Sequence, residues 1–341
     1  MEIRILSRNN LEKVLEMPKV IEGVKSVYKL KSKGDTAVWP LVEHHFEEKK
    51  AVMDIRSGGV FGDINLHGLK MLNNFPGNAV DGLPVFTGML MVFDSNTGLP
   101  MGVMDASYIT CMRTGAAGAI GAQALARPES DVLFVLGAGK QAIFQIAATL
   151  ITMPQIRKVY VADPLNRTNA ETFAAGCYER LKDDFDVIRP DVEFVPVSAE
   201  SELKEALAET DIVITITPAR EPAIRKEWIR PGTHFSCVGA DMVGKEEIDP
   251  EIFAGARIFA DDIAQCMRVG EMEIPVKTGV ISQEDIAGEI GQVLAGTAKG
   301  RTSAEEITIF DATGLALLDL VTAKAAIELA GEKGLGIVAD M

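Results

Sequence analysis

The stretch Asp131-Val132-Leu133-Phe134-Val135-Leu136-Gly137-Ala138-Gly139-Lys140-Gln141-Ala142 decides the fold of this chain. Five apolar residues precede a Gly-x-Gly-x-x-Ala pattern, and an apolar, amphipathic segment follows it through Leu150. This order predicts a buried strand, a tight turn and a helix. Gly137 can adopt the dihedral angles of the turn, Gly139 leaves the backbone open to a pyrophosphate, and Ala142 permits close packing of helix on strand.

The turn would present the N-terminus of a helix, whose N–H groups and partial positive charge attract phosphates. A second strand, 159–162, ends on Asp163, near the offset of a residue that accepts a hydrogen bond from a ribose 2′-hydroxyl. We therefore predict dinucleotide binding; the alternative is a glycine turn that serves packing alone. Asp163 favours NAD because it would repel a 2′-phosphate, although Arg167 is near enough in sequence to leave NADP possible.

Beyond Asp131 the pattern alternates between strands and helices. Strands are expected at 132–136, 158–162, 192–197, 211–216, 233–238 and 257–261, and helices at 140–152, 167–182 and 201–208. Such alternation predicts a parallel, doubly wound sheet with right-handed crossovers. We also expect a helix from Asp285 to Ala298 and a short strand from Ile307 to Phe310.

The N-terminal part has a different pattern. It predicts a strand and a helix within residues 1–30, then strands of a mostly antiparallel sheet at 35–60, 66–78, 85–93 and 101–104, and a helix rich in Ala and Gly at 107–126. A last helix, about 316–331, is expected to return to this part. Four methionines (Met89, Met91, Met101, Met104) are expected in its core, and His44 and His45 in an exposed turn.

We therefore predict an α/β protein with two domains. Residues 119–312 would form a Rossmann-type dinucleotide-binding domain with a doubly wound parallel sheet. Residues 1–118 and 313–341 would form a second, α+β domain.

Composition narrows the function. The 341 residues carry a formal net charge of −15, which argues against a nucleic-acid surface or an anionic membrane as partner. No apolar run approaches the ~20 residues that span a bilayer, and the N-terminus lacks the pattern of a signal peptide. The four cysteines are widely spaced and the histidines lack metal-ligand spacing, so we expect a cytoplasmic protein with no metal.

Lys70 and Arg113 are candidates for substrate binding. Lys70 lies in the middle of a predicted strand between apolar neighbours, where burial is costly without an anionic partner. It would contact a substrate carboxylate or carbonyl, or transfer a proton; alternatively its ammonium group reaches solvent. Arg113-Thr114 opens the Ala/Gly-rich helix, and arginine can bind a carboxylate with two hydrogen bonds. The alternative is a surface arginine that caps the preceding loop.

Three predicted strand ends carry further candidates, because ligands of open α/β sheets bind outside the carboxyl ends of strands. Asp241, with Lys245 nearby, would be an acid/base or the partner of a cationic amine; alternatively it is a turn aspartate. Thr217 would lie beside the ribose of the cofactor or form an ordinary strand exit. The turn 311–314 would border the nicotinamide or act as a domain hinge.

Together these motifs resemble the ornithine cyclodeaminase/mu-crystallin family over nearly the whole chain. The residues that carry the resemblance are Gly68-Leu69-Lys70 with Pro76-Gly77-Asn78, Arg113 to Ala117, Gly137 to Gln141, Val238 to Asp241 with Gly244-Lys245, and Phe310 to Gly314 with Leu317 and Asp319. Within the family, the stretch from Gly279 to Ala326 looks most like the archaeal alanine dehydrogenase branch.

The resemblance implies a homodimer that uses NAD(P) and acts on a small 2-amino or 2-imino acid. The second domain would bind substrate and form the dimer. Lys70 and Arg113 would hold the substrate carboxylate or carbonyl, Asp241 would be the catalytic acid, and Thr313 would border the substrate. The cofactor would contact Thr114, Gly137, Ala138, Gly139, Lys140, Gln141, Asp163, Arg167, Thr217, Asp241, Lys245 and Ala312.

One departure from the family pattern concerns the substrate. The family usually has a basic residue near the position of Pro40, and here the run is Val38-Trp39-Pro40-Leu41. Arg56 is our candidate to replace it.

Three functions follow as alternatives. The first is an amino acid dehydrogenase or imine reductase, in which hydride moves between the substrate α-carbon and the nicotinamide. The second is a cyclodeaminase that uses NAD without net oxidation. The third is a cofactor-binding protein with weak catalysis, of the mu-crystallin kind.

Overall fold

The computed structural model describes residues 2–340 and divides the chain into two compact units. Unit 1 contains the residues up to Arg113 and those from Leu315 onward, and unit 2 is Thr114–Gly314. These boundaries lie within a few residues of the expected ones at 118/119 and 312/313. The first boundary falls inside helix α3 (Ala106–Leu125).

Unit 1 is built on an eight-stranded mixed sheet. Its order is β18 (Ile337–Asp340), β1 (Glu2–Leu6), β7 (Pro100–Asp105), β6 (Phe86–Asp94), β5 (Leu66–Asn74), β4 (Ala51–Val60) and β2 (Thr36–Val38), with β3 (Val42–Phe46) also paired to β4. Only β1 and β7 run parallel, so the mostly antiparallel sheet is confirmed. The edge strand β18 is an addition that the sequence did not predict.

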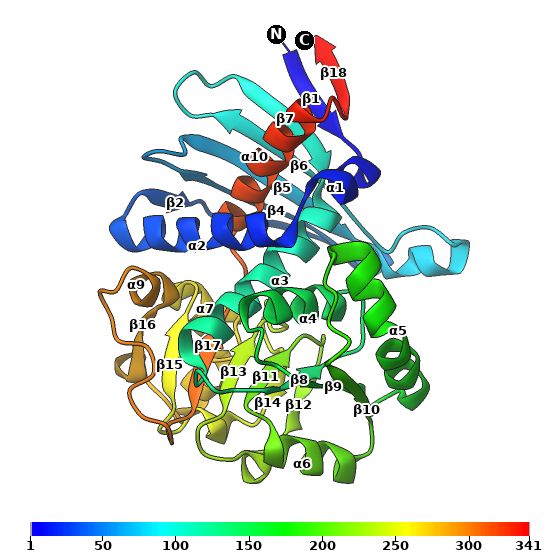
Figure 1. Ribbon diagram of the computed structural model, residues 1–341. Coiled ribbons are helices and arrows are strands. Elements are labelled where there is room, and N and C mark those ends of the chain that lie inside the picture. Colours follow the sequence, from blue (N-terminus) through cyan, green and yellow to red (C-terminus); the bar gives the residue numbers. More distant parts are fainter. Residues whose placement is uncertain (1, 341) are drawn as a thin grey trace. The chain divides into compact units, whose positions relative to one another are not determined.

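Helix α10 (Ala316–Glu332) lies across one face of this sheet, with α2 (Met17–Lys33) beside it (Figure 1). Two strand glycines make the close approach possible. A Cβ atom on Gly58 would stand 2.9 Å from the side chain of Leu317, and one on Gly68 would stand 2.6 Å from that of Leu320. Helix α1 (Arg8–Val14) is capped by Ser7, whose side chain accepts a hydrogen bond from the amide of Asn10.

The opposite face of the sheet carries exposed apolar side chains. Residues alternate between the two faces of a strand, so Met71 and Met89, direct partners across β5 and β6, point away from α10. They are 36% and 58% exposed. The prediction of a methionine core is therefore wrong for Met89, whereas Met104 is buried. His44 and His45 are exposed as expected, but they lie in strand β3 and not in a turn.

Unit 2 contains a fully parallel sheet of eight strands. The order is β10 (Glu193–Val197), β9 (Lys158–Ala162), β8 (Val132–Leu136), β11 (Ile212–Thr215), β13 (His234–Cys237), β17 (Thr308–Asp311), β15 (Arg257–Ala260) and β16 (Ile286–Glu289). Chain order reverses between β8 and β11, which makes this the switch point of the sheet. The predicted strands are confirmed to within one residue at either end.

Helices cover both faces of this sheet. Helix α4 (Ala142–Thr152) packs against α5 (Arg167–Phe185), and α6 (Glu200–Glu209) connects β10 to β11. Figure 1 draws α4 and α6 on opposite sides of the strands, as right-handed crossovers require. A continuous apolar core with Phe134, Val213 and Phe235 at its centre fills the space under the sheet.

The helix expected from 285 to 298 is wrong. Residues Ile286–Glu289 form strand β16, and only Ile290–Leu294 form a helix, α9. Gly288 explains the difference because its φ of +146° is incompatible with a helix. Four short elements were not predicted: α7 (Ile263–Val269), α8 (Glu273–Thr278), and a two-stranded parallel pair of β12 (Arg220–Ile224) and β14 (Glu246–Ile248).

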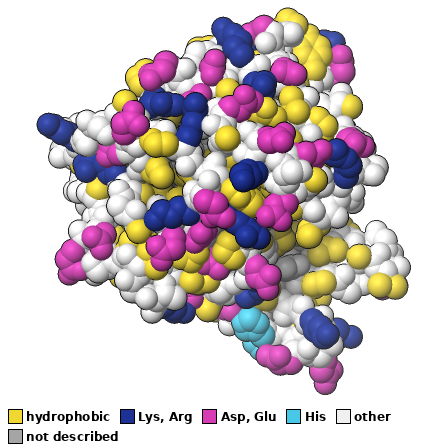
Figure 2. All heavy atoms as spheres, turned by 90° about the horizontal axis from the view of Figure 1, so that it is seen from below, with side chains coloured by type: hydrophobic (Ala, Val, Ile, Leu, Met, Phe, Trp, Pro, Cys, Tyr) yellow, Lys and Arg dark blue, Asp and Glu magenta, His cyan; other side chains and the backbone are white. Residues whose placement is uncertain are grey.

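The surface of the protein mixes charges of both signs. Figure 2 shows Lys and Arg side chains beside Asp and Glu side chains over the face that it draws. Within residues 2–340, no helix is both long and apolar enough to cross a bilayer. The same residues contain no group of three or more His, Cys, Asp or Glu side chains arranged to hold a metal ion.

Candidate functional site

A buried ionic cluster joins three elements of unit 1. Lys70, in the middle of β5, places its Nζ 2.8 Å from Oδ2 of Asp319 on α10 and 3.2 Å from Oγ1 of Thr110 on α3. Arg113, one turn after Thr110, donates its Nε to Oδ1 of Asp319 at 3.1 Å. Lys70 and Asp319 are completely buried and Arg113 is 6% exposed. We call Lys70, Arg113 and Asp319 the cationic cluster.

Burial and neighbouring charges set the ionisation of this cluster. Burial lowers the pKa of Lys70 to about 8; Asp319 opposes the shift, and Arg113 and Arg56 add to it. Burial alone would raise the pKa of Asp319, but the charges of Arg113 and Lys70 outweigh it and hold that pKa below its usual value. Asp319 is therefore ionised, and Lys70 is poised to exchange a proton near neutral pH.

Arg56 stands next to the cluster. It is the direct partner of Lys70 across β4 and β5, so both side chains leave the sheet on the same face. Its Nε lies 3.5 Å from Oδ1 of Asp54. Lys70, Arg113 and Arg56 therefore place three cationic groups near Asp54 and Asp319.

The guanidinium group of Arg113 has hydrogen-bond donors that the cluster does not use. Within residues 2–340 the only hydrogen bond of the Arg113 side chain is the one from Nε to Asp319, so the two terminal nitrogens are left for a ligand. A guanidinium group oriented in this way can bind a carboxylate through both oxygens. The cluster therefore suits a small anion. The alternative in which the ammonium group of Lys70 reaches solvent is wrong, because Lys70 is buried against Asp319, a partner that was not foreseen. Its contact with a substrate stays a prediction.

The glycine turn of unit 2 has the expected geometry. Gly137, directly after β8, has a φ of +117°, which strongly favours glycine. A Cβ atom on Gly139 would meet no atom of the described residues within 4 Å, so the backbone here faces open space that a phosphate could fill. Helix α4 begins at Ala142, and its N-terminus adds partial positive charge. The residues present therefore fit a dinucleotide.

Two neighbouring strand ends complete this edge of the sheet. Thr217 follows β11 at the switch point, and its methyl carbon would be 3.1 Å from a Cβ on Gly137. Asp163 follows β9, and its Oδ2 accepts the side-chain amide of Asn169 at 2.8 Å. Asn169 also donates to the carbonyl of Ala138 at 3.2 Å, which ties Asp163 to the glycine turn. The strand ends that sequence analysis selected thus share one edge of unit 2.

The loop after β13 presents Asp241. Its Oδ1 accepts a hydrogen bond from Nζ of Lys245 at 2.6 Å, and Lys245 also donates to the carbonyl of Gly239. The side chain of Asp241 is 37% exposed, so it can reach a ligand. The amide of Thr217 donates to Oε1 of buried Glu247 at 2.5 Å, which joins the loop after β11 to strand β14, the strand that follows this loop.

The last candidates follow β17. Thr313 is buried, and its Oγ1 accepts a hydrogen bond from Nε2 of Gln265 at 2.8 Å. Ala312 donates its amide to the carbonyl of Cys237. Asp311 accepts the amide of Met272, and burial raises its pKa to about 8. These contacts hold the turn, and a role for Thr313 or Ala312 in ligand binding stays a prediction.

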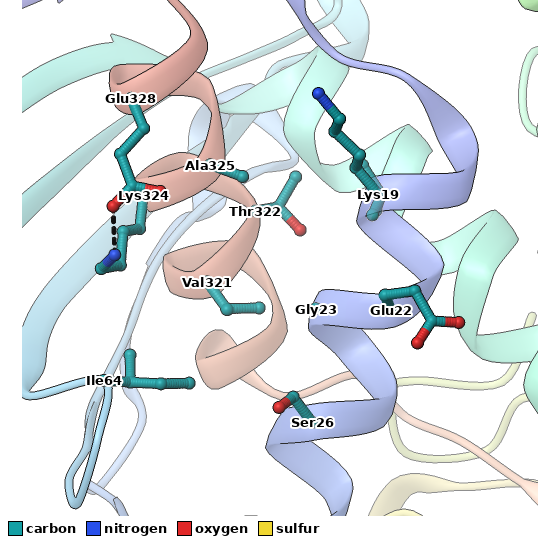
Figure 3. Close-up of a pocket in the computed structure, with 11 residues that line it drawn as sticks. Lys19, Glu22, Gly23, Ser26, Ile64, Val321, Thr322, Lys324, Ala325 and Glu328 are labelled. Carbon is teal, nitrogen blue, oxygen red and sulfur yellow. Dashed lines mark hydrogen bonds and ion pairs between the residues drawn. The ribbon is translucent and has the colours of Figure 1, made fainter.

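A cavity elsewhere in unit 1 does not belong to these sites. About 300 Å³ lies between α2 and α10, lined by residues such as Lys19, Ser26 and Thr322 (Figure 3). Its lining includes none of the residues that the sequence selected, and Lys324 at its rim is paired with Glu328.

A parallel sheet that reverses its chain order beside a glycine turn, together with a second unit built on a mixed sheet, defines a Rossmann-type α/β protein of two domains. Comparison with known proteins identifies the family within this class. The model of the ornithine cyclodeaminase/mu-crystallin family matches residues 1–334, and the chain belongs to that family.

Three relatives illustrate the similarity. Alanine dehydrogenase of Archaeoglobus fulgidus is 37% identical over 336 residues, which cover 98% of each chain. The solved structure of an archaeal alanine dehydrogenase dimer with bound NAD has a TM-score of 0.90 at 36% identity and covers both chains fully. Δ1-pyrroline-2-carboxylate reductase of Thermococcus litoralis, solved with NADH and L-proline, has a TM-score of 0.88 at 32% identity and covers 98% of this chain and 99% of its own.

Proposed function

We propose that this protein is a NAD-dependent oxidoreductase that acts on the C–N bond of a small 2-amino or 2-imino acid. The cationic cluster is the observation that carries the proposal. A buried lysine and arginine share one carboxylate, and the terminal nitrogens of Arg113 remain for a second one. A substrate carboxylate would supply it. Relatives that are an alanine dehydrogenase and an imine reductase support the same reaction class.

Binding of the carboxylate would fix the orientation of the substrate. Arg113 would donate two hydrogen bonds to it, and Lys70 and Arg56 would add positive charge to the same region. A carboxylate held in this way turns the α-carbon in one direction, which lowers the entropic cost of the reaction. Arg56 would also supply the charge that the family usually places near Pro40.

Asp241 would orient and deprotonate the amino group of the substrate. Nζ of Lys245 donates a hydrogen bond to Oδ1 of Asp241 at 2.6 Å, which holds the carboxylate in one orientation. An ionised aspartate can orient an ammonium group and accept its proton, or activate water for attack on an imine. The meeting of Asp241 with Lys70 and Arg113 around one substrate stays a prediction.

When NAD is bound, its nicotinamide accepts or returns the hydride. Unit 2 would hold it as the dinucleotide-binding domain, with the glycine turn against the pyrophosphate and Asp163 on the adenosine ribose. The other proposed contacts are Thr114, Ala138, Lys140, Gln141, Thr217, Lys245 and Ala312. Support comes from the open space before Gly139 and from relatives solved with NAD or NADH.

One experiment separates the possible outcomes. The purified protein is incubated with NAD+ and a panel of small amino acids, and both reduced cofactor and ammonia are measured. Reduced cofactor supports the oxidoreductase, with stoichiometric ammonia from an open-chain amino acid and none from a cyclic one such as proline. Ammonia without reduced cofactor means a cyclodeaminase, and tight cofactor binding with neither product from any amino acid means a protein of the mu-crystallin kind.

We further propose that unit 1 forms a homodimer. Its sheet face away from α10 carries Ile55, Leu69, Met71, Met89 and Met91, and a second copy would cover these apolar side chains. An archaeal relative solved as a dimer supports this assembly. A cytoplasmic location belongs to the same proposal, since the four cysteines are buried free thiols that suit a reducing compartment.

A further inference from the structure

A network of charged side chains surrounds the carboxyl ends of β9 and β10 in unit 2. Asp163 ends β9, Arg167 begins α5, and Glu202 lies in the first turn of α6. In dinucleotide-binding sheets, this acidic position contacts the adenosine ribose, and an arginine near it accommodates the 2′-phosphate of NADP. Arg167, four residues after Asp163, is the arginine near the acidic position in this chain.

The guanidinium group of Arg167 is already engaged. Both of its terminal nitrogens bind the carboxylate of Glu202, with Nη1 3.1 Å from Oε2. Its Nε lies 3.5 Å from Oε1 of Glu171, one turn further along α5. A 2′-phosphate would have to displace Glu202 before it could bind Arg167.

Glu202 is itself held firmly. Its Oε2 accepts the amides of Ser198 and Ala199 at 2.9 and 3.0 Å, which caps α6. These backbone hydrogen bonds hold the pKa of Glu202 below its usual value, so the group is ionised at neutral pH. Ser198 also donates its hydroxyl to the carbonyl of Asp163 at 2.7 Å, which connects the carboxylate to the predicted ribose position.

Asp163 is fixed in the same way. Its Oδ1 accepts the amides of Leu165 and Asn166 at 3.1 and 3.0 Å, and Asn169 holds its other oxygen. The carboxylates of Asp163, Glu171 and Glu202 thus accompany one guanidinium group. The excess negative charge repels a 2′-phosphate, whereas a ribose diol can donate hydrogen bonds to Asp163.

Resting on the nicotinamide dinucleotide binding proposed above, we infer that Glu202 is a specificity-determining residue: it withholds Arg167 and thereby makes the protein reject NADP(H) in favour of NAD(H). Asp163 repels the phosphate directly, and Glu202 engages Arg167, a cation that would compensate. Selectivity would then depend on a residue of α6, which is separated from the Asp163 turn by helix α5 and strand β10.

The test is a fluorescence titration of wild type and Glu202→Gln with NADH and with NADPH. Glutamine keeps an oxygen to accept the amides of Ser198 and Ala199 but loses the charge that holds Arg167. We expect the Kd for NADPH to fall about fivefold or more, as a released guanidinium gains a charge-assisted contact, and the Kd for NADH to stay within about twofold.

Three further variants make the result specific. Glu200→Gln removes a charge from the same turn of α6, where Glu200 pairs with Arg225, and should leave the ratio of the two Kd values unchanged. Arg167→Ala added to Glu202→Gln should abolish the gain. Arg167→Ala alone should not weaken NADPH binding, because in the wild type Glu202 already occupies the guanidinium group. If thermal melting shows that Glu202→Gln folds poorly, this single variant still tests the role of Glu202.

An unchanged ratio in Glu202→Gln, an equal shift in Glu200→Gln, or a loss of NADPH affinity in Arg167→Ala alone would overturn the role of Glu202. If one of these results is found but the wild type binds NADH, only the role of Glu202 is refuted and the proposed function is retained. Wild type that binds neither cofactor overturns both proposals.

Discussion

Lys70 and Asp319 form a fully buried ion pair at 2.8 Å between the middle of a strand and the first turn of the C-terminal helix. If β5 and α10 moved apart, each charged side chain would remain buried without its partner, so the pair holds the strand and the helix together. Because Arg113 binds the other oxygen of the same carboxylate, Asp319 positions both proposed carboxylate-binding side chains.

Loss of the Asp319 charge should destabilise the protein strongly. In Asp319→Asn, Lys70 stays buried beside a neutral group, and removing one partner of a buried pair costs about 3–5 kcal/mol. Glu328→Gln is the matched control on the same helix, since Glu328 forms an exposed pair with Lys324 and should cost at most about 0.5 kcal/mol. Urea unfolding followed by circular dichroism measures both, and equal stability of the two variants would contradict the role of Asp319.

Substrate binding should weaken as the pH rises through about 8. The pKa of Lys70 is lowered from 10.5 to about 8, so its positive charge is present below that pH and disappears above it. The KM for a carboxylate substrate should therefore rise on the alkaline side, with kcat less affected. Asp319 raises the pKa of Lys70, so in a folded Asp319→Asn variant the same limb should move to lower pH. A profile flat up to about pH 10 would refute a charged Lys70 in binding.

A methyl group on Gly139 should interfere with the cofactor and not with folding. The position faces open space, so Gly139→Ala meets no protein atom but occupies the region proposed for the pyrophosphate. We expect the Kd for NADH to rise about tenfold, or ~1.4 kcal/mol, at an unchanged melting temperature. Gly176→Ala, on α5 with the same open surroundings, is the control and should leave NADH binding unaffected. Equal Kd values for both variants would remove Gly139 from the binding site.

Turnover should depend on the carboxylate of Asp241. Asp241→Asn keeps the shape of the side chain and loses its ability to take a proton, so kcat should fall by about a hundredfold or more. The Kd for NADH should stay within about twofold. Glu251→Gln, which removes a carboxylate from another exposed pair of unit 2, should retain wild-type kcat. Comparable kcat in Asp241→Asn and wild type would exclude Asp241 from the mechanism.

The apolar face of unit 1 should control assembly. Met89→Lys places a charge at the centre of the surface proposed to meet a second copy, and burial of an unpaired charge is costly. We expect the variant to sediment as a monomer where the wild type sediments as a dimer. Leu165→Lys, at a highly exposed leucine of unit 2, should not change the sedimentation. A Met89→Lys protein that remains dimeric would place the interface elsewhere.

The parallel sheet could be predicted because its strands are continuous apolar runs, such as Val132–Leu136, that end at glycine or polar turns. The edge strand β16 is the exception, because its residues were expected to form a helix. The exposed strand β3 could not be predicted in the same way, since His44 and His45 extend only because they pair with Val52 and Met53 of β4. Strand β18 is likewise defined by its partner β1 at the other end of the chain.

Sequence reasoning identified Lys70 and Arg113 but not the group that organises them. Asp319 is 249 residues from Lys70, and no local rule joins the two. One sign was present: Asp319 is a single acidic residue within the apolar run Leu315–Val321, where a charge requires a buried partner. Glu202 gave no such sign, because an acidic residue in the first turn of a helix is ordinary.

The dependence of Lys70 on Asp319 has a consequence for biosynthesis. Asp319 follows Lys70 by 249 residues, and the whole of unit 2, Thr114–Gly314, is synthesised between them. Strand β5 therefore lacks the carboxylate that neutralises its lysine until all of unit 2 has been made. A fragment that stops at Gly314 should resist protease over unit 2 and be cleaved within β4 to β7, so the strands made first should reach their stable fold after the domain that is inserted between them.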